Sequence, residues 1–454
     1  MAMLSVFFSL LFILFFSYQP LIKLCVSGGK LVQDTQFQHV HSLDSLLPMP
    51  TCQSTTRPGI GRKYGAALIP SRGPCSPFPW GRDLSRGHSI GKSLAGTNPQ
   101  KKPTRGGRGG SQVPIMRDGY QYLVQVRIGN PPHPLTLIMD TGSGITWTQC
   151  IPCPHDVLCQ YYNQTNPFFK TTGSSTFSFK PNLHPYNIKY FDGSQSRGPM
   201  AQDTLIIGSP QAYHIPNFTF GCGQYSEGYF GTADGIFGLG AEGENAFLSQ
   251  TSSTLGQTLC FCIPPTSSSI GHLFLGDDAR TNCQTEGSSS TLLINDKKYI
   301  VNLYGITVGS QTINIANLDP SYPNQTLIDS GTAITRLPRL VYQKLRSAFR
   351  EYMSKYPVIA SSHDDDIMDT CYNLKDYTTV ALPKIVLHFD RANVTLDPAG
   401  VVSLESKSRI CLAFAENKFP DHEFNIMGSV QMRKLNVLFD VNARKVRFGR
   451  GSCG

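Results

Sequence analysis

One short pattern occurs twice in this chain and limits the folds that the chain can adopt. The heptad Asp140-Thr-Gly-Ser-Gly-Ile-Thr recurs as Asp329-Ser-Gly-Thr-Ala-Ile-Thr. An Ile-x-Gly element follows each heptad at nearly the same distance, because Gly238 lies 98 residues after Asp140 and Gly428 lies 99 residues after Asp329. Two different motifs repeated at one offset indicate that the chain after about residue 119 is a duplication, and not that it contains two unrelated turns.

The segments around the repeat predict β-strands. Residues 120–128 alternate apolar and polar side chains up to a Gly-Asn-Pro-Pro turn signal, and residues 135–139 and 326–328 are short apolar runs that lead into the two aspartates. Residues 340–352 are the clearest candidate for a helix. Because 454 residues exceed what one core usually organises, we expect a mainly β, bilobal fold with two pseudo-symmetric β lobes and a few short helices.

The two aspartates, Asp140 and Asp329, suggest acid–base chemistry on a water molecule. Two carboxyl groups held close together cannot both ionise cheaply, so one keeps its proton while the other acts as a base. The base can take a proton from water while the acid polarises and then protonates a peptide carbonyl. This scheme needs no metal and no cofactor, and it favours acid pH. In each turn a glycine, Gly142 or Gly331, would let backbone amides approach the carboxylate. The hydroxyl groups of Ser143 and Thr332 would fix the outer carboxylate oxygens, and those of Thr141 and Ser330 would link the two turns.

The first residues of the chain indicate export. Residues 4–16 are almost wholly apolar, and small residues near Val26 follow, a pattern typical of a secretory signal peptide over residues 1–27; an uncleaved anchor is the alternative. Without Cys25, the remaining cysteines are even in number, which suits disulfides formed in an oxidising compartment. A zinc site at Cys150-x-x-Cys153 is disfavoured because no second pair stands at ligand spacing. We therefore expect a secreted, extracellular protein, with the vacuole as a second possible destination, and N-glycan acceptors at Asn163, Asn217, Asn324 and Asn393.

Positive charge is concentrated early in the chain. Residues 28–118 contain 13 Lys and Arg against 4 Asp and Glu, whereas residues 119–454 contain 26 against 27. The run KKPTRGGR at residues 101–108 is typical of a protease-accessible linker. We interpret residues 28–118 as a basic propeptide and linker, cleaved between Lys101 and Asp118. The alternative is that this region binds nucleic acid. No aromatic residues alternate with its basic residues, as they do in single-strand binders. We therefore expect no nucleic-acid binding by the mature form.

The duplicated motifs resemble those of pepsin-like aspartic proteases, in particular the plant nepenthesin-type branch with its chloroplast nucleoid DNA-binding protease-like members. The resemblance covers about residues 120–453 and extends to Trp147-Thr-Gln-Cys, Phe220-Gly-Cys and Asp369-Thr-Cys-Tyr. It implies an N-terminal catalytic lobe at residues 119–295 and a C-terminal catalytic lobe at residues 296–454. It also implies a monomeric endopeptidase that cleaves proteins and peptides and binds pepstatin-like inhibitors.

The resemblance also implies a flap that covers the bound peptide. Tyr190 stands at the position of the flap tyrosine, followed by Asp192, Gly193 and Ser194, and Trp147 is similar to the tryptophan that supports it. Phe191 departs from the family pattern, which usually has glycine at this position, and Gly144 replaces a common acidic or polar residue. A bulky residue at a hairpin bend could stiffen the flap or weaken activity. Because of Phe191, the alternative remains that this protein is a non-catalytic inhibitor or binding protein with the same fold.

The disulfide pairing is implied by the resemblance alone. It gives Cys150–Cys153, Cys159–Cys222, Cys371–Cys411 and Cys262–Cys453, which leaves Cys260 to pair with Cys283.

Overall fold

The computed structural model describes residues 39–42, 111–154, 158–283, 289–293, 298–318, 324–359, 367–406, 408–418 and 424–453. The predicted signal peptide and the basic run at residues 101–108 lie outside these residues. Within the described part of the chain, no helix is both long and apolar enough to cross a membrane. Strands predominate, which confirms the mainly β prediction, and the helix predicted at residues 340–352 is α5 (Arg339–Tyr352).

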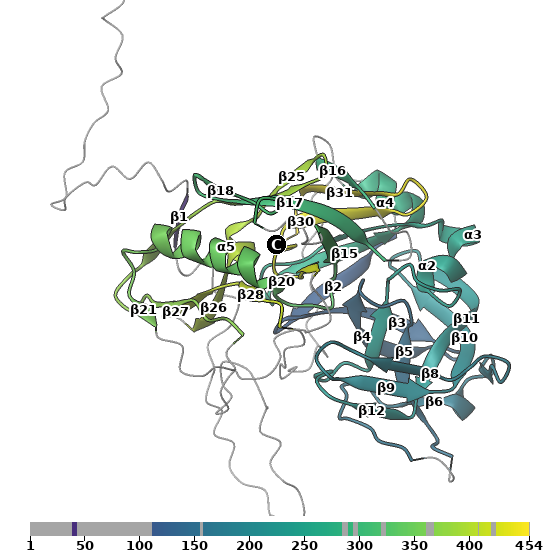
Figure 1. Ribbon diagram of the computed structural model, residues 1–454. Coiled ribbons are helices and arrows are strands. Elements are labelled where there is room, and N and C mark those ends of the chain that lie inside the picture. The colour runs from purple at the N-terminus through teal and green to yellow at the C-terminus, as the bar shows by residue number, and fades with distance from the viewer. Residues whose placement is uncertain are drawn as a thin grey trace, which may run out of the picture. The chain divides into compact units, whose positions relative to one another are not determined.

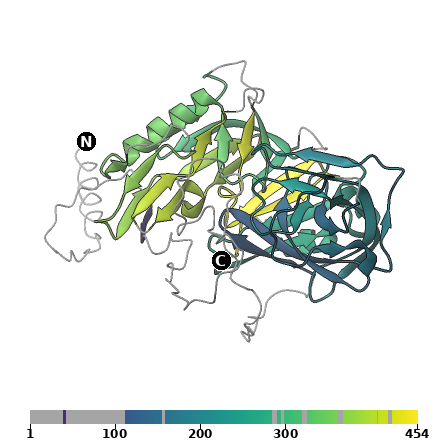
Figure 2. The same ribbon diagram turned by 90° about the horizontal axis from the view of Figure 1, so that it is seen from below.

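The largest sheet has 14 strands and joins the beginning of the duplicated region to its end. Strands β30 (Leu435–Asp440) and β31 (Lys445–Arg450) continue this sheet beside β14, so the yellow C-terminal strands lie next to blue and teal N-terminal ones (Figure 2). The other strands are β2 (Val113–Asp118), β3 (Gln121–Ile128), β4 (His133–Asp140), β5 (Trp147–Ile151), β6 (Phe169–Lys170), β7 (Ser178–Phe179), β10 (Met200–Ile207), β11 (Tyr213–Gly223), β13 (Gly235–Gly238), β14 (Thr258–Cys262), β15 (Ile270–Leu275) and β16 (Ser289–Leu292).

Strand β2 begins before the lobe boundary that we drew from the sequence. We assigned residues 28–118 to the propeptide and linker, but β2 pairs with β3 on one side and with β15 on the other. Val113 and Ile115 are buried in the core because alternate residues of the strand face inward. The sheet of the N-terminal lobe therefore includes residues 113–118.

The second large sheet has eight strands and contains the second aspartate turn. The strand before that turn, β19, pairs in parallel with β29, and β29 pairs in antiparallel fashion with β20. Around the first turn, β4 pairs in parallel with β13, and β13 pairs in antiparallel fashion with β5, so the duplication extends to the strand pairing. The strands of this sheet are β17 (Ile300–Val308), β18 (Gln311–Asn314), β19 (Gln325–Ile328), β20 (Thr335–Leu337), β24 (Ile385–Phe389), β25 (Ala392–Thr395), β28 (Phe414–Glu416) and β29 (Asn425–Met427).

Three small sheets and short helices complete the described elements (Figure 1). One sheet contains β8 (Tyr186–Lys189), β9 (Gln195–Gly198) and β12 (Tyr225–Glu227), and a second contains β21 (Val358–Ile359), β22 (Cys371–Asn373), β26 (Val402–Ser406) and β27 (Arg409–Leu412). In the third, β1 (His39–Ser42) from the predicted propeptide pairs with β23 (Thr379–Leu382). The helices other than α5 are α2 (Phe247–Gln250), α3 (Ser252–Leu255), α4 (Gly276–Asn282), α6 (Pro398–Val401) and the 3-10 turn Thr171–Gly173.

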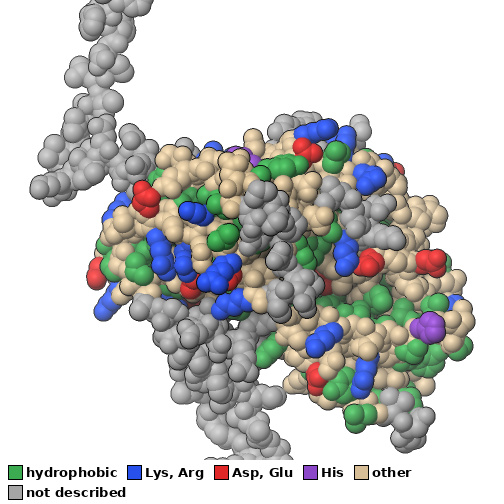
Figure 3. Space-filling model, in the orientation of Figure 1, with side chains coloured by type: hydrophobic (Ala, Val, Ile, Leu, Met, Phe, Trp, Pro, Cys, Tyr) green, Lys and Arg blue, Asp and Glu red, His purple; other side chains and the backbone are tan. Residues whose placement is uncertain are grey.

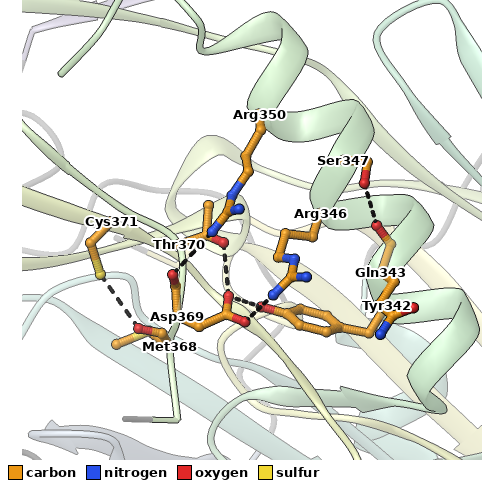
Figure 4. Close-up of polar contacts among 9 residues, drawn as sticks. All are labelled: Tyr342, Gln343, Arg346, Ser347, Arg350, Met368, Asp369, Thr370 and Cys371. Carbon is orange, nitrogen blue, oxygen red and sulfur yellow. Dashed lines mark hydrogen bonds and ion pairs between the residues drawn. The ribbon is translucent and has the colours of Figure 1, made fainter. Parts of the chain in front are cut away.

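Helix α5 packs one face against the core and is anchored by Asp369 (Figure 4). The Asp369 carboxylate accepts hydrogen bonds from Tyr342 and Arg346 on the helix and from Thr370 Oγ1, the last at 2.8 Å. Burial raises the pKa of Asp369, but these hydrogen bonds and the charge of Arg346 outweigh it and lower the pKa below its usual value. The outward face of α5 carries exposed basic residues, Arg339, Lys344 and Arg350, and blue side chains gather over this helix in Figure 3.

Two of the five disulfides expected from resemblance are wrong. The structure pairs Cys150 with Cys222 and Cys153 with Cys159, in place of Cys150–Cys153 and Cys159–Cys222. Cys150 and Cys222 lie on the neighbouring parallel strands β5 and β11, where both are fully buried and their Cα atoms are 5.3 Å apart. The pairs predicted correctly are Cys260–Cys283, Cys262–Cys453 and Cys371–Cys411.

Candidate active site

The first aspartate, Asp140, is the last residue of β4 and is held by its own turn. Gly142 N donates to Asp140 Oδ1 at 2.9 Å, and Ser143 Oγ donates to Asp140 Oδ2 at 2.5 Å. The parallel strand β13 supports the turn from behind, because Gly238 is the register partner of Asp140. One amide and one hydroxyl therefore fix the two oxygens of this carboxylate.

The second aspartate, Asp329, directly follows β19 and is held in the same way. Gly331 N donates to Asp329 Oδ1 at 2.8 Å, and Thr332 Oγ1 donates to Asp329 Oδ2 at 2.6 Å. The amide of Asp329 itself donates to Met427 O of β29 at 3.0 Å. The roles that the sequence suggested for both glycines and both hydroxyls match the geometry of the two turns.

Reciprocal hydrogen bonds link the two turns to each other. Thr141 N donates to Ser330 Oγ at 3.0 Å, and Ser330 N donates to Thr141 Oγ1 at 2.9 Å. Each hydroxyl also donates across the interface to a backbone carbonyl, Thr141 to Ile328 O and Ser330 to Met139 O, both at 2.9 Å. These four bonds lie in the buried interior, so they tie the two halves of the duplication together at the site.

The two carboxylates face each other across the paired glycines. A Cβ added to Gly142 would stand 2.6 Å from Asp329 Oδ1, and a Cβ added to Gly331 would overlap Asp140 Oδ1. A larger residue at either position would displace the aspartate of the opposite turn. Glycine is therefore required here by close approach between the two turns, which is more specific than the backbone freedom that the sequence suggested.

Burial and a neighbouring charge affect the protonation of Asp329. Asp140 is 2% exposed and Asp329 is 5% exposed. The pKa of Asp329 is raised above the usual carboxyl range, first by burial and next by the negative charge of Asp140, against the opposing effect of hydrogen bonds from Thr332 and Gly331. The arrangement therefore favours one proton shared by the two carboxyls, with one acid and one base beside each other.

A further pair of hydrogen bonds, which the sequence analysis did not assign, holds the Ile-x-Gly elements against the turns. Gly238 N donates to Thr146 Oγ1 at 3.2 Å, and Gly428 N donates to Thr335 Oγ1 at 3.0 Å. Both threonines are the last residue of their heptad. The repeated threonine and the repeated glycine were visible in the sequence, but nothing there showed that they contact each other.

Tyr190 directly follows β8 in the predicted flap hairpin. Trp147 Nε1 donates to Tyr190 Oη at 2.7 Å, so the expected support of the tyrosine by the tryptophan is present. Phe230 packs edge-on against both rings, with centroids 5.0 Å from Trp147 and 5.9 Å from Tyr190. Phe230 was not predicted from the sequence, because no motif distinguishes it from an ordinary core aromatic residue.

The other flap residues shape the hairpin turn. Asp192 Oδ1 accepts from Ser194 N at 2.8 Å, and Gly193 has a φ of +81°, a conformation that favours glycine. Ser194 Oγ is buried and accepts from Tyr229 N at 2.8 Å, so it supports the hairpin from within. Phe191 is 42% exposed at the turn.

The glycine at position 144 has a structural reason. A Cβ at Gly144 would overlap the carbonyl oxygen of Glu242. The backbone around Glu242 approaches the first aspartate turn so closely that no side chain fits. Local packing therefore explains why glycine stands where the resemblance led us to expect an acidic or polar residue.

The described residues give no sign of a metal centre, since none of them form a group of three or more His, Cys, Asp or Glu side chains that could hold an ion. Of the glycan acceptors predicted from the sequence, Asn163, Asn217 and Asn393 are exposed, whereas Asn324 is half-buried.

Comparisons with known proteins agree with this fold. Residues 121–450 match the sequence model of the eukaryotic aspartyl protease family. Aspartyl protease AED1 of Arabidopsis thaliana is 35% identical over 73% of this chain and 72% of its own length, and aspartic proteinase nepenthesin-1 of Nepenthes gracilis is 32% identical over 77% and 82%. The structure of conglutin gamma, a basic 7S globulin from lupine seeds, is similar in fold, with a TM-score of 0.60 at 17% identity over 75% of this chain and 94% of the other. The resemblance and the two-lobed pepsin-like fold inferred from the sequence are confirmed, and the chain belongs to the eukaryotic aspartyl protease family.

Proposed function

We propose that this protein is an endopeptidase that hydrolyses peptide bonds with a water molecule activated between Asp140 and Asp329. One observation carries the proposal: two buried carboxylates, each held by its own amide and hydroxyl donor, sit in turns that are joined by reciprocal hydrogen bonds. Because the donors are already in place, little reorganisation is needed when charge moves during the reaction.

The reaction follows from one proton shared by two carboxyls. The ionised carboxyl takes a proton from water as the water oxygen bonds to the carbonyl carbon, while the protonated carboxyl gives its proton to the carbonyl oxygen. The resulting tetrahedral diol collapses when the carboxyl that took the proton from water donates it to the amine nitrogen and the C–N bond breaks. The other carboxylate takes a proton from one diol hydroxyl as the carbonyl of the acid product re-forms. The pair ends with one proton again, ready for the next water.

The raised pKa of Asp329 gives this mechanism its pH dependence. Catalysis requires that the pair carry a single proton. Burial and the neighbouring Asp140 raise the pKa of Asp329, so that proton is kept to higher pH than an isolated carboxyl would keep it. Activity is highest in acid and falls as rising pH removes the last proton.

The test is digestion of denatured globin and of quenched peptides at about pH 3 to 5, with and without pepstatin. We expect Asp140→Asn and Asp329→Asn each to lower kcat/KM by at least about 1,000-fold, since each removes a proton-transfer group. Asp376→Asn is the matched control, because Asp376 is exposed in the turn after β22. Full activity in Asp140→Asn would contradict the mechanism, and pepstatin binding without hydrolysis would favour a non-catalytic binding relative. A single species in size-exclusion chromatography at the monomer mass would support a monomer.

We further propose that the protein is made as an exported precursor and is processed ahead of Ser111. Cleavage after Asp118 would remove β2, a strand paired on both sides, whereas cleavage before Ser111 leaves the sheet intact. Five disulfides within the described residues suit an oxidising compartment, either extracellular or vacuolar. N-terminal sequencing of the purified protein tests the cleavage site. Glycopeptide mapping should find higher glycan occupancy at Asn163, Asn217 and Asn393 than at Asn324.

Any affinity of the precursor for nucleic acid belongs to the basic propeptide, where the positive charge of the chain is concentrated. Salt-dependent retention on DNA by the precursor alone would reflect its charge. Strong retention by the processed protein would instead indicate a nucleic-acid role that this proposal does not include.

A further inference from the structure

The tip of the flap touches the opposite lobe through an aromatic pair. Phe191 lies in the turn between β8 and β9 of the N-terminal lobe, and Phe424 directly precedes β29 of the C-terminal lobe. Their ring centroids are 6.4 Å apart, with an angle of 61° between the ring planes. This is the edge-to-face arrangement that aromatic side chains favour.

Phe424 belongs to a fixed part of the C-terminal lobe close to the second aspartate. Its carbonyl accepts a hydrogen bond from Asn417 Nδ2 at 3.0 Å, and Asn417 N donates to Leu337 O of β20 at 2.7 Å. Strand β29 begins at the next residue and ends at Met427, whose carbonyl accepts from Asp329 N. A contact with Phe424 therefore ties the flap to the framework that holds Asp329.

The base of the flap is held from its own lobe. Trp147 donates to Tyr190, and Phe230 packs against both rings. With Phe191 on Phe424, the hairpin spans from the lobe that carries Asp140 to the lobe that carries Asp329. Movement of the hairpin tip away from the C-terminal lobe therefore requires the two rings to separate.

We propose that Phe191 and Phe424 are positioning residues that form an aromatic clasp, which holds the flap tip against the C-terminal lobe in the free protein and forms again over a bound peptide. The role in peptide binding rests on the proposed function, whereas the clasp itself exists in the ligand-free structure. The clasp is formed in the free protein and again in the peptide complex, and it is broken while the peptide enters or leaves. It therefore slows association and dissociation of the peptide alike and changes the Kd little.

The first experiment measures hydrogen exchange of flap amides in the ligand-free protein. Phe424→Ala should speed exchange in the peptide spanning residues 186–198 by about two- to ten-fold, the range expected from an aromatic pair. Phe191→Ala should do the same, and the double variant should exchange no faster than either single one. The matched control is Phe179→Ala, which removes a similarly exposed phenylalanine that packs on Phe177 with centroids 4.9 Å apart. Unchanged flap exchange in Phe424→Ala would overturn the clasp, whether or not the protein is catalytic.

The second experiment measures the association and dissociation rates of pepstatin. Both rates should rise by about two- to ten-fold in Phe191→Ala and in Phe424→Ala, with Kd within about two-fold of the original. Phe191→Tyr keeps the ring and should restore the original rates. Faster dissociation alone, with weaker Kd, would mean that the variants damage the inhibitor site and would refute a clasp. Failure of the unchanged protein to bind pepstatin would count against the proposed function, while the exchange experiment would still decide the clasp.

Discussion

The two aspartate turns and the flap are held in place by different kinds of contact. The aspartate of each turn is buried, and each turn is fixed by hydrogen bonds from its own residues and from the opposite turn. The flap is held by the hydrogen bonds from Trp147 to Tyr190 and from Tyr229 N to Ser194 Oγ and by aromatic contacts, and Phe191 at its tip is exposed. Directional bonds in a buried interior resist displacement, whereas a few aromatic contacts at the surface can break and form again. The chain therefore combines two tightly bonded aspartate turns with a flap that fewer directional contacts hold in place.

The largest effect is expected when a side chain is placed between the two turns. In Gly331→Ala the new Cβ would overlap Asp140 Oδ1 and push the carboxylates apart. We expect a loss of at least about 100-fold in kcat, since small displacements of catalytic groups have effects of this size. Gly173→Ala is the control, because its Cβ would meet only Lys170 Cβ at an ordinary 3.6 Å. Full activity in Gly331→Ala would show that the two turns can shift to accommodate a Cβ without moving the carboxylates apart.

The next effect concerns stability. Thr141→Val keeps the shape of the side chain but leaves Ser330 N and Ile328 O without their partner. We expect the free energy of unfolding in urea to fall by about 1–3 kcal/mol, the usual cost of unpaired buried groups. Thr312→Val, at an exposed position of β18, should change it by less than about 0.5 kcal/mol. Equal losses in the two variants would mean that the link between the turns contributes little.

A smaller effect is expected in the flap. Trp147→Phe removes the donor to Tyr190 Oη while it keeps an aromatic ring beside Phe230. We expect kcat/KM to fall by about five- to ten-fold, which corresponds to one hydrogen bond. Tyr190→Phe should have a similar effect, and the double variant should be no worse than either. Additive losses would show that the two residues act separately.

The smallest effect concerns how the free energy of unfolding depends on pH, because Asp329 and Asp369 contribute to it in opposite directions. The raised pKa of Asp329 stabilises the fold below about pH 4, the pKa of an unfolded carboxyl, and this contribution is lost as pH rises through the folded value. Asp329→Asn should therefore gain stability relative to the original protein toward neutral pH.

The lowered pKa of Asp369 acts in the opposite direction, because its contribution is present above about pH 4 and is lost as pH falls. Asp369→Asn should be less stable than the original protein at neutral pH, by about 1 kcal/mol, with a smaller deficit in acid. Unfolding free energies measured across pH for both variants check the two signs. Slopes of the same sign would contradict the assigned pKa directions.

The sequence predicted the turns better than their surroundings. Asp140, Asp329 and their neighbours lie in one repeated heptad, so local spacing alone identified them. Strand alternation also predicted β3 and the apolar periodicity predicted α5. These features depend on residues that are close in the chain.

Contacts between distant residues were not predictable in the same way. The resemblance implied a pair between Cys150 and Cys153, but Cys150 is buried on β5 beside Cys222 of β11. Nothing in the sequence predicted that Phe230 and Phe424 contact the flap, because an isolated aromatic residue is usually an ordinary core residue. Strand β2 was assigned to the linker because the basic run before it dominated the local composition.

The hydrogen bond between Trp147 and Tyr190 also has a spectroscopic consequence. The chain has two tryptophans, and the other, Trp80, lies in the predicted propeptide. A protein processed ahead of Ser111 would carry a single indole, buried and bonded to the flap tyrosine. Its emission wavelength and intensity would report flap position in solution without any attached dye.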